Sequence, residues 1–195
     1  MDAFPSPPQD ADSPLSDADS LRNARASRNL AVARWLLGDA GRAVLAALPP
    51  YRSDDVFALT ARLRRERLDA DQAAAALTLS RLRARAAAKF GERAGAMFFT
   101  ADGYEQATRL SVGALHAARF VEAGARRVID FGCGIGADSL AFTLAGLDVA
   151  AIESDPVAAL YAAANAPKAK VTCANGLATE LPDADAIWLD PARRA

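Results

Sequence analysis

Apolar positions recur at helical spacing along the first half of the chain. In NLAVARWLLGDAGRAVLAALPP they return every three or four residues, with a break expected at Gly38 and a stop at the Pro-Pro pair. SDDVFALTARLRRERL begins with Ser53, a residue that favours the N-cap position. DADQAAAALTLSRLRARAAAKFG is rich in strong helix formers and ends at Gly91. These stretches predict a helical N-terminal domain over residues 27–100.

The pattern changes along residues 101–195. After the apolar link MFFT, DGYEQATRLSVGALHAARFVEAG is predicted to form one amphipathic helix that ends near Gly124. RRVIDFG, LDVAAIESD, AKVTCANG and DAIWLDP then have the pattern of strands, and ADSLAFTLAG and PVAALYAAANA have that of helices. Strands that alternate with helices indicate a parallel sheet with crossover helices. The predicted fold class is therefore α/β, with a Rossmann-like domain after the helical one.

The first 26 residues have neither pattern. They are rich in Pro, Ser and Asp, which predicts a disordered tail, and they lack the basic start and apolar centre of a secretory signal. No stretch approaches the run of about 20 apolar residues that crosses a membrane. Cys133 and Cys173 form no CxxC pair, and no metal-ligand spacing is present. A reduced, cytoplasmic protein is the simplest interpretation.

Charge is distributed unevenly along the chain. Residues 1–20 carry a net charge of −5, residues 21–127 carry 19 bases and 10 acids for a net charge of +9, and residues 128–195 return to −5. The basic middle section could contact a polyanion such as RNA. The alternative is a set of arginine-rich helix faces that are simply exposed to solvent.

Three glycines follow the first predicted strand in VIDFGCGIGADSLAF. Glycine lets the backbone approach a ligand where a Cβ atom would collide, and the helix behind the loop offers free N–H groups. Gly132, Gly134 and Ala137 satisfy the dinucleotide pattern GxGxxG/A. Asp130 with the three glycines satisfies DxGxGxG, which resembles the first motif of class I methyltransferases that use S-adenosyl-L-methionine.

Asp130 favours the second of these two interpretations. A carboxylate is unfavourable beside a pyrophosphate, whereas S-adenosylmethionine carries an ammonium group that a carboxylate can bind. Glu153 ends the next strand, where either family has an acid on the ribose hydroxyls, so it does not discriminate. Asp190-Pro191 follows the fourth strand, in the place of the fourth methyltransferase motif, where the Asp faces the methyl acceptor. Ala192 and Arg193 replace the Pro and aromatic residue of the amine-methylating version.

Taken together, FFTADGYEQATRLSVGALHAARF, the glycine motif and LDPARR resemble a bacterial family of class I methyltransferases that carry a THUMP-like domain. The family is distantly similar to trimethylguanosine synthases, and the resemblance covers roughly residues 30–195. It implies that Asp130 holds the methionine ammonium and that Gly132, Gly134 and Gly136 let the backbone approach the cofactor. It also implies ribose binding by Glu153, adenine binding by Asn175 and orientation of the acceptor by Asp190 and Pro191.

The same resemblance makes the segment before the first strand a candidate for closing the cofactor site. Its candidate residues are Glu105, Gln106, Thr108 and Arg109. RNA is the substrate class that the resemblance favours. Such domains have seven strands, so the resemblance also implies a domain truncated after the fourth motif.

Two other functions compete with methyl transfer. One is a nicotinamide-dependent oxidoreductase, against which Asp130 argues. The other is a non-enzymatic or inactive protein that keeps the cofactor pocket. His116 and Trp188 are expected to be structural, and Cys133 to be a small buried residue.

Overall fold

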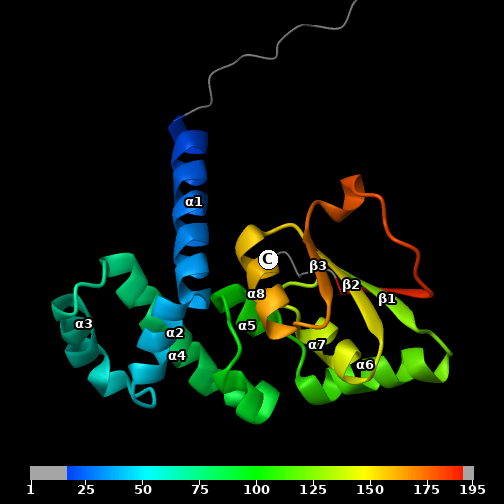
Figure 1. Ribbon diagram of the computed structural model, residues 1–195, viewed down its shortest axis with the longest axis horizontal. Coiled ribbons are helices and arrows are strands. Elements are labelled where there is room, and N and C mark those ends of the chain that lie inside the picture. Colours follow the sequence, from blue (N-terminus) through cyan, green and yellow to red (C-terminus); the bar gives the residue numbers. More distant parts are fainter. Residues whose placement is uncertain (1–16, 191–195) are drawn as a thin grey trace, which may run out of the picture.

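The computed structural model describes residues 17–190, and over this range the chain has the predicted α/β fold (Figure 1). A helical section is followed by a parallel sheet with crossover helices. None of the described helices is long and apolar enough to cross a membrane. The helices are α1 (Asp17–Leu37), α2 (Asp39–Ala47), α3 (Val56–Arg65), α4 (Ala70–Phe90), α5 (Ala101–Gln106), α6 (Leu110–Glu122), α7 (Ala137–Leu144) and α8 (Pro156–Asn165). The strands are β1 (Arg127–Phe131), β2 (Asp148–Glu153), β3 (Lys170–Cys173) and β4 (Ala186–Leu189), and three 3₁₀ turns are η1 (Ser53–Asp55), η2 (Gly91–Gly95) and η3 (Gly176–Ala178).

The four strands form one sheet in the order β3-β2-β1-β4, and all neighbouring strands are parallel. In its register Asp130 of β1 lies between Ala151 of β2 and Trp188 of β4. Each strand forms in the stretch where the sequence predicts it. Because β2 and β4 flank β1 on opposite sides, the carboxyl end of β1 is a topological switch point, the place where open α/β sheets bind ligands.

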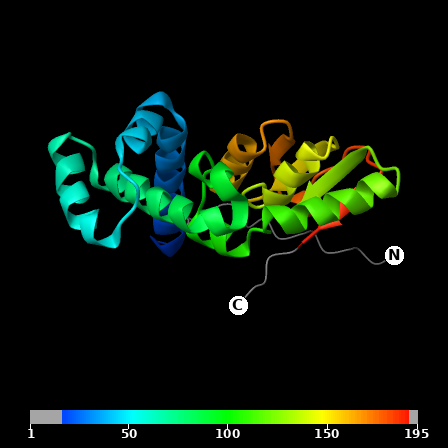
Figure 2. The same cartoon turned by 90° about the horizontal axis from the view of Figure 1, so that it is seen from below.

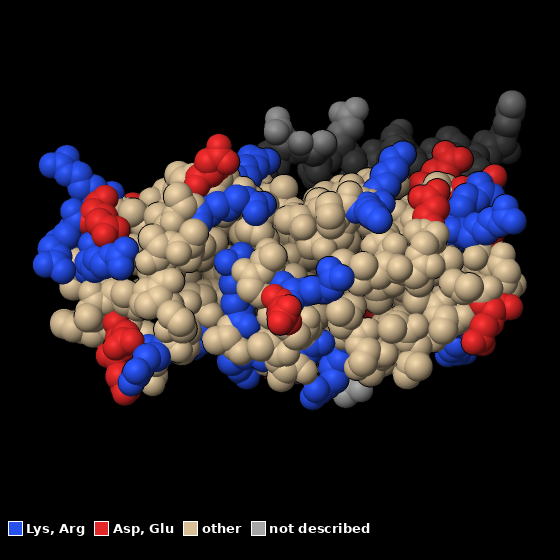
Figure 3. Space-filling view, turned by 60° about the horizontal axis from the view of Figure 1, so that its bottom comes forward, with Lys and Arg blue, Asp and Glu red and all other residues tan. Residues whose placement is uncertain are grey.

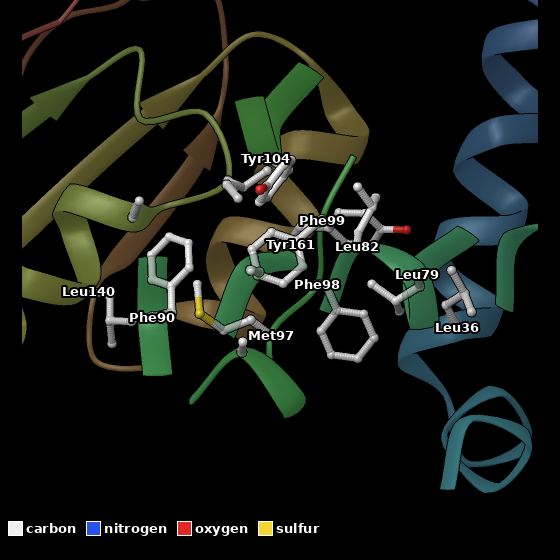
Figure 4. Close-up of a cluster of buried hydrophobic side chains, with 14 of the residues drawn as sticks. Leu36, Leu79, Leu82, Phe90, Met97, Phe98, Phe99, Tyr104, Leu140 and Tyr161 are labelled. Carbon is white, nitrogen blue, oxygen red and sulfur yellow. The ribbon is translucent and has the colours of Figure 1, made fainter. Parts of the chain in front are cut away.

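One hydrophobic core joins the helical section to the sheet section (Figure 4). Leu36 of α1 and Leu79 of α4 belong to the same buried cluster as Phe98 of the link, Leu140 of α7 and Tyr161 of α8. Asn165, itself buried at the end of α8, accepts a hydrogen bond from the N–H of Phe98 and donates to the carbonyl oxygens of Phe98 and Ile135. The packing therefore crosses residue 100, where the sequence predicts a domain boundary.

A second cluster covers one face of the sheet. Val128 of β1 and Val149 of β2 pack there against Ala117 of α6 and Phe142 of α7. Consecutive side chains of β4 lie on opposite faces of the sheet: Trp188 packs against this cluster, whereas Leu189 is 62% exposed. The view from below shows α6, in light green, running alongside the sheet section (Figure 2).

The N-terminal helix is longer than the sequence predicts. Residues 17–26 are helical as the start of α1, although they were expected to belong to the disordered tail; residues 1–16 lie outside the described range. Asp17 and Asp19 occupy the first turn, where acids interact favourably with the helix dipole, and Arg22 forms an ion pair with Asp19 at 2.6 Å. These local contacts stabilise a helix in a segment whose composition predicts disorder.

Two details of the helical predictions are wrong. Ser53 does not cap α3: it begins η1, its hydroxyl donates to Asp54, and α3 starts at Val56. The single helix expected before β1 is instead broken into α5 and α6. The ammonium group of Lys89 donates to the carbonyl oxygens of Tyr104, Glu105 and Ala107, so a distant side chain ends α5.

Candidate functional site

The carboxyl edge of the sheet brings most of the predicted site residues to one cleft. The cleft has a volume of about 1650 Å³ and runs from the end of β1 to the exposed face of α1. Eight predicted residues line it: Glu105, Gln106, Thr108, Asp130, Gly132, Gly134, Glu153 and Asp190. They come from α5 and the α5–α6 junction, from β1 and the loop after it, from β2 and from the end of β4.

The glycine loop, residues 132–136, has the backbone that its sequence requires. Gly132, Gly134 and Gly136 all have positive φ angles, between 55° and 78°, which disfavour any residue with a Cβ atom. A Cβ atom on Gly132 or Gly134 would meet no atom within 4 Å, so this side of the loop is open to a ligand. Gly136 has another role, since a Cβ atom there would lie 3.0 Å from the Cα atom of Ala162. It lets α8 pack against the loop.

Asp130 is the most deeply buried acid of the cleft, with 2% of its surface exposed. Its Oδ2 atom accepts a 2.5 Å hydrogen bond from the hydroxyl of Ser139. Burial raises the pKa of Asp130 to about 7, and the nearby acids Asp138 and Asp190 add to the rise, while the Ser139 hydrogen bond opposes it. A cationic group bound here would favour the charged carboxylate.

Glu153 connects the glycine loop to the turn after β2. Its carboxylate accepts hydrogen bonds from the N–H groups of Gly134 and Asp155, both at 2.8 Å. Asp155 in turn caps α8 by accepting from the N–H of Ala158. Glu153 therefore joins the glycine loop to the turn after β2 and also lines the cleft.

Asn175 and Pro191 stand apart from this group, as does Gly136. Asn175 is exposed and is not among the described residues that line the cleft; its Oδ1 atom accepts from the N–H of Leu177 and so caps η3. Pro191 lies outside the described residues, whereas its neighbour Asp190 is described, exposed and at the cleft.

Asp138, an acid that the sequence did not single out, joins the α5–α6 segment to α7 at the cleft. Asp138, in the first turn of α7, accepts hydrogen bonds from the hydroxyl of Thr108 at 2.7 Å and from Nδ1 of His116 at 3.3 Å. The His116 ring in turn stacks on Trp188, with ring centroids 4.4 Å apart. An acid in a first helical turn usually serves the helix dipole, so no signal in the sequence sets Asp138 apart.

Glu105, although it lines the cleft, and Arg109 also make structural contacts. Glu105 pairs with Arg85 at 3.1 Å, and Arg109 caps the start of α6 through its backbone and donates to the carbonyl oxygen of Ala88. Burial raises the pKa of the Cys133 thiol, which is therefore not a nucleophile at neutral pH. Among the residues described, no group of His, Cys, Asp and Glu is arranged to hold a metal ion.

The wall of the cleft opposite the sheet comes from the helical section. One face of α1, including Arg25, Arg28 and Val32, looks onto it, together with residues of α4. Of the described charged residues that line the cleft, these two arginines are basic and eight are acidic: Asp71, Asp102, Glu105, Asp130, Asp138, Glu153, Asp155 and Asp190. The inner end of the cleft therefore suits a cation, and its basic groups lie on α1.

Comparison with known proteins bears on the helical section alone. A family model described as a domain of unknown function (DUF8688) matches residues 28–86, which run from α1 into α4. The match includes no part of the sheet or of the glycine loop. No curated protein matches the chain.

Proposed function

We propose that this protein is a methyltransferase that uses S-adenosyl-L-methionine. The observation that carries the proposal is the open glycine loop with a buried acid, Asp130, at the switch point of a parallel sheet. The resemblance of the same residues to the first motif of class I methyltransferases supports it. The two free cysteines, Cys133 and Cys173, fit a reducing compartment, so we propose a cytoplasmic location.

The described residues fit the methionine and ribose parts of this cofactor. Asp130 would bind the ammonium of the methionine part, and the acids around it suit the net positive charge. The open sides of Gly132 and Gly134 leave room for the cofactor against the backbone. Glu153 would accept hydrogen bonds from the ribose hydroxyls. Asn175 would reach the adenine only if η3 moved toward the cleft, because its Oδ1 atom now caps that turn.

The chemistry requires alignment more than activation. When bound, the cofactor supplies a methyl group on a sulfonium, which is already electrophilic. The protein must hold the acceptor in line behind that methyl group, and positioning of this kind supplies much of the rate enhancement. Asp190, exposed at the cleft after β4, would orient the acceptor and receive its proton.

RNA is the acceptor that we propose. The support is the net charge of +9 over residues 21–127 and the arginines of α1 at the cleft. On the face shown in Figure 3, Lys and Arg side chains are interspersed with acids rather than gathered into one patch. An RNA strand would therefore be held by a few arginines near the cleft and not by a broad basic surface.

Calorimetric titration of the purified chain with S-adenosylmethionine, with NAD as a parallel ligand, tests the cofactor. We expect saturable heat with the first and none with the second, because a buried carboxylate disfavours a pyrophosphate. A matched Gly134→Ala variant should lose most of the binding, since its φ of 55° and its open side both require glycine.

The possible results separate three functions. Binding of NAD in place of S-adenosylmethionine would identify an oxidoreductase and reject the proposal. Binding of S-adenosylmethionine without transfer of a labelled methyl group to cellular RNA, protein or small molecules would indicate a binding protein. Transfer to protein but not RNA would keep the activity and reject the acceptor.

A further inference from the structure

Asp138 is an acid enclosed between helices at the edge of the cleft. Only 8% of its surface is exposed, and it lies in the first turn of α7, immediately behind the glycine loop. Its two carboxylate oxygens accept from different donors, Oδ2 from Thr108 and Oδ1 from His116. Both donors belong to the α5–α6 segment, so one carboxylate joins that segment to α7.

Helices α6 and α7 pack closely beside Asp138. Gly113 of α6 faces α7, and a Cβ atom on it would lie 2.8 Å from the Cβ atom of Ala141 and 3.3 Å from Oδ1 of Asp138. The two helices can therefore meet closely enough for His116 to reach the carboxylate. Through its stack on His116, Trp188 of β4 joins the same arrangement and lines the cleft beside Asp190.

We propose that Asp138 is a positioning residue of the cofactor site, which holds Thr108 and, through His116, Trp188 in the cleft wall around Asp130. This inference rests on the proposed function, because it takes the cleft to be the cofactor site. Thr108 was a candidate for direct contact with the cofactor, but its hydroxyl hydrogen is used on Asp138. Its contribution is then to keep the α5–α6 junction in place.

Asp138 also acts on Asp130 through its charge. Asp130 faces Ser139 and Asp138 of α7, Cys133 of the glycine loop and Asp190 after β4. The charge of Asp138 is one of the causes that raise the pKa of Asp130, after burial. Removal of that charge lowers the pKa of Asp130, so the carboxylate that binds the ammonium forms at lower pH.

The first test needs no cofactor. The chain has two tryptophans, so a Trp35→Phe background leaves Trp188 as the sole tryptophan, and excitation beyond the absorption band of tyrosine selects its emission. Asp138→Asn in this background should change the emission of Trp188, because the His116 ring against it loses its carboxylate partner. Asp148→Asn removes the same charge from the exposed first residue of β2, at the amino ends of the strands and away from the cleft. This control should leave the emission unchanged. Equal emission in all three proteins would overturn the positioning role.

The second test measures the dissociation constant of S-adenosylmethionine between pH 5.5 and 8.5. Asp138→Asn should weaken binding about tenfold at pH 8, the expected effect of losing hydrogen bonds to a charged group. It should also move the midpoint of the pH dependence to lower pH, which a purely structural defect would not do. Thr108→Val should weaken binding in the same direction, and Thr108→Ser should restore it.

The outcomes distinguish this inference from the proposed function. If the wild-type chain does not bind S-adenosylmethionine, the proposed function fails, whatever Trp188 reports. If the wild-type chain binds and Asp138→Asn keeps its affinity and midpoint, the inference fails alone. If Asp138→Asn does not fold, the two Thr108 variants test the inference instead. Equal affinity of Thr108→Val and Thr108→Ser for S-adenosylmethionine would then overturn it.

Discussion

Asp130 combines deep burial with a proposed role that requires charge. Burial raises the pKa of Asp130 from 3.8 to about 7. Between these two pH values the Asp130 carboxyl is therefore protonated in the folded protein and ionised in the unfolded chain. More protons bound in the folded state mean that stability falls as pH rises from about 4 to about 7. The acid is therefore a cost to the ligand-free fold at neutral pH, which is typical of a binding residue and not of a structural one.

Replacement of this acid by its amide separates the two effects. Asp130→Asn keeps an oxygen that can accept from Ser139 but cannot ionise. We expect similar unfolding free energies for variant and wild type at pH 4, and at pH 8 an advantage for the variant of about 4 kcal/mol. Urea unfolding at the two pH values measures this difference. The same variant should lose binding of S-adenosylmethionine, and a variant that binds like the wild type would contradict the role of Asp130.

Among the elements, α8 carries the residue that joins the link to the glycine loop. Asn165 serves the N–H and carbonyl of Phe98 and the carbonyl of Ile135, and all three of its bonds are buried and 2.8–2.9 Å long. Asn165→Ala would leave these backbone groups without partners. We expect a loss of about 4 kcal/mol in unfolding free energy, measured by urea denaturation.

The matched control uses the same residue type on the surface. Asn175→Ala removes one exposed hydrogen bond, to the N–H of Leu177, and should cost less than about 1 kcal/mol. Comparable losses in the two variants would mean that Asn165 does not join the link to the loop in solution.

The elements that the sequence predicted and those that it missed differ in the range of the forces that form them. The strands and helices around the glycine loop follow from local apolar patterns, and Gly91 ends α4 with a positive φ angle that glycine favours. The break at Thr108 could not be predicted, because Lys89 and Asp138 impose it from other helices. His116 and Asp138 are 22 positions apart, and only the packing of α6 on α7 brings them together.

At the scale of the whole molecule, the helical section is part of the cleft and not an independent appendage. It shares a core with the sheet section, and eight described residues of α1 line the cleft, among them Leu21, Arg25, Arg28 and Val32. The family match to residues 28–86 includes Arg28 and Val32 of this wall, together with α2 and α3, which do not line the cleft. If the inner, acidic end holds the cofactor, the wall formed by α1 is where an acceptor would lie.

The arginines of this wall give the proposed RNA acceptor a direct test. Arg25→Glu with Arg28→Glu should weaken the binding of a fluorescent single-stranded RNA more than tenfold in low salt, and should lower the salt dependence by about two counterions. Fluorescence anisotropy at several salt concentrations measures both. Arg64→Glu with Arg65→Glu changes the net charge equally on α3, outside the residues that line the cleft, and should have a smaller effect. Equal losses in the two double variants would show that RNA responds to the overall charge of the chain, and the cleft would then have no special part in binding it.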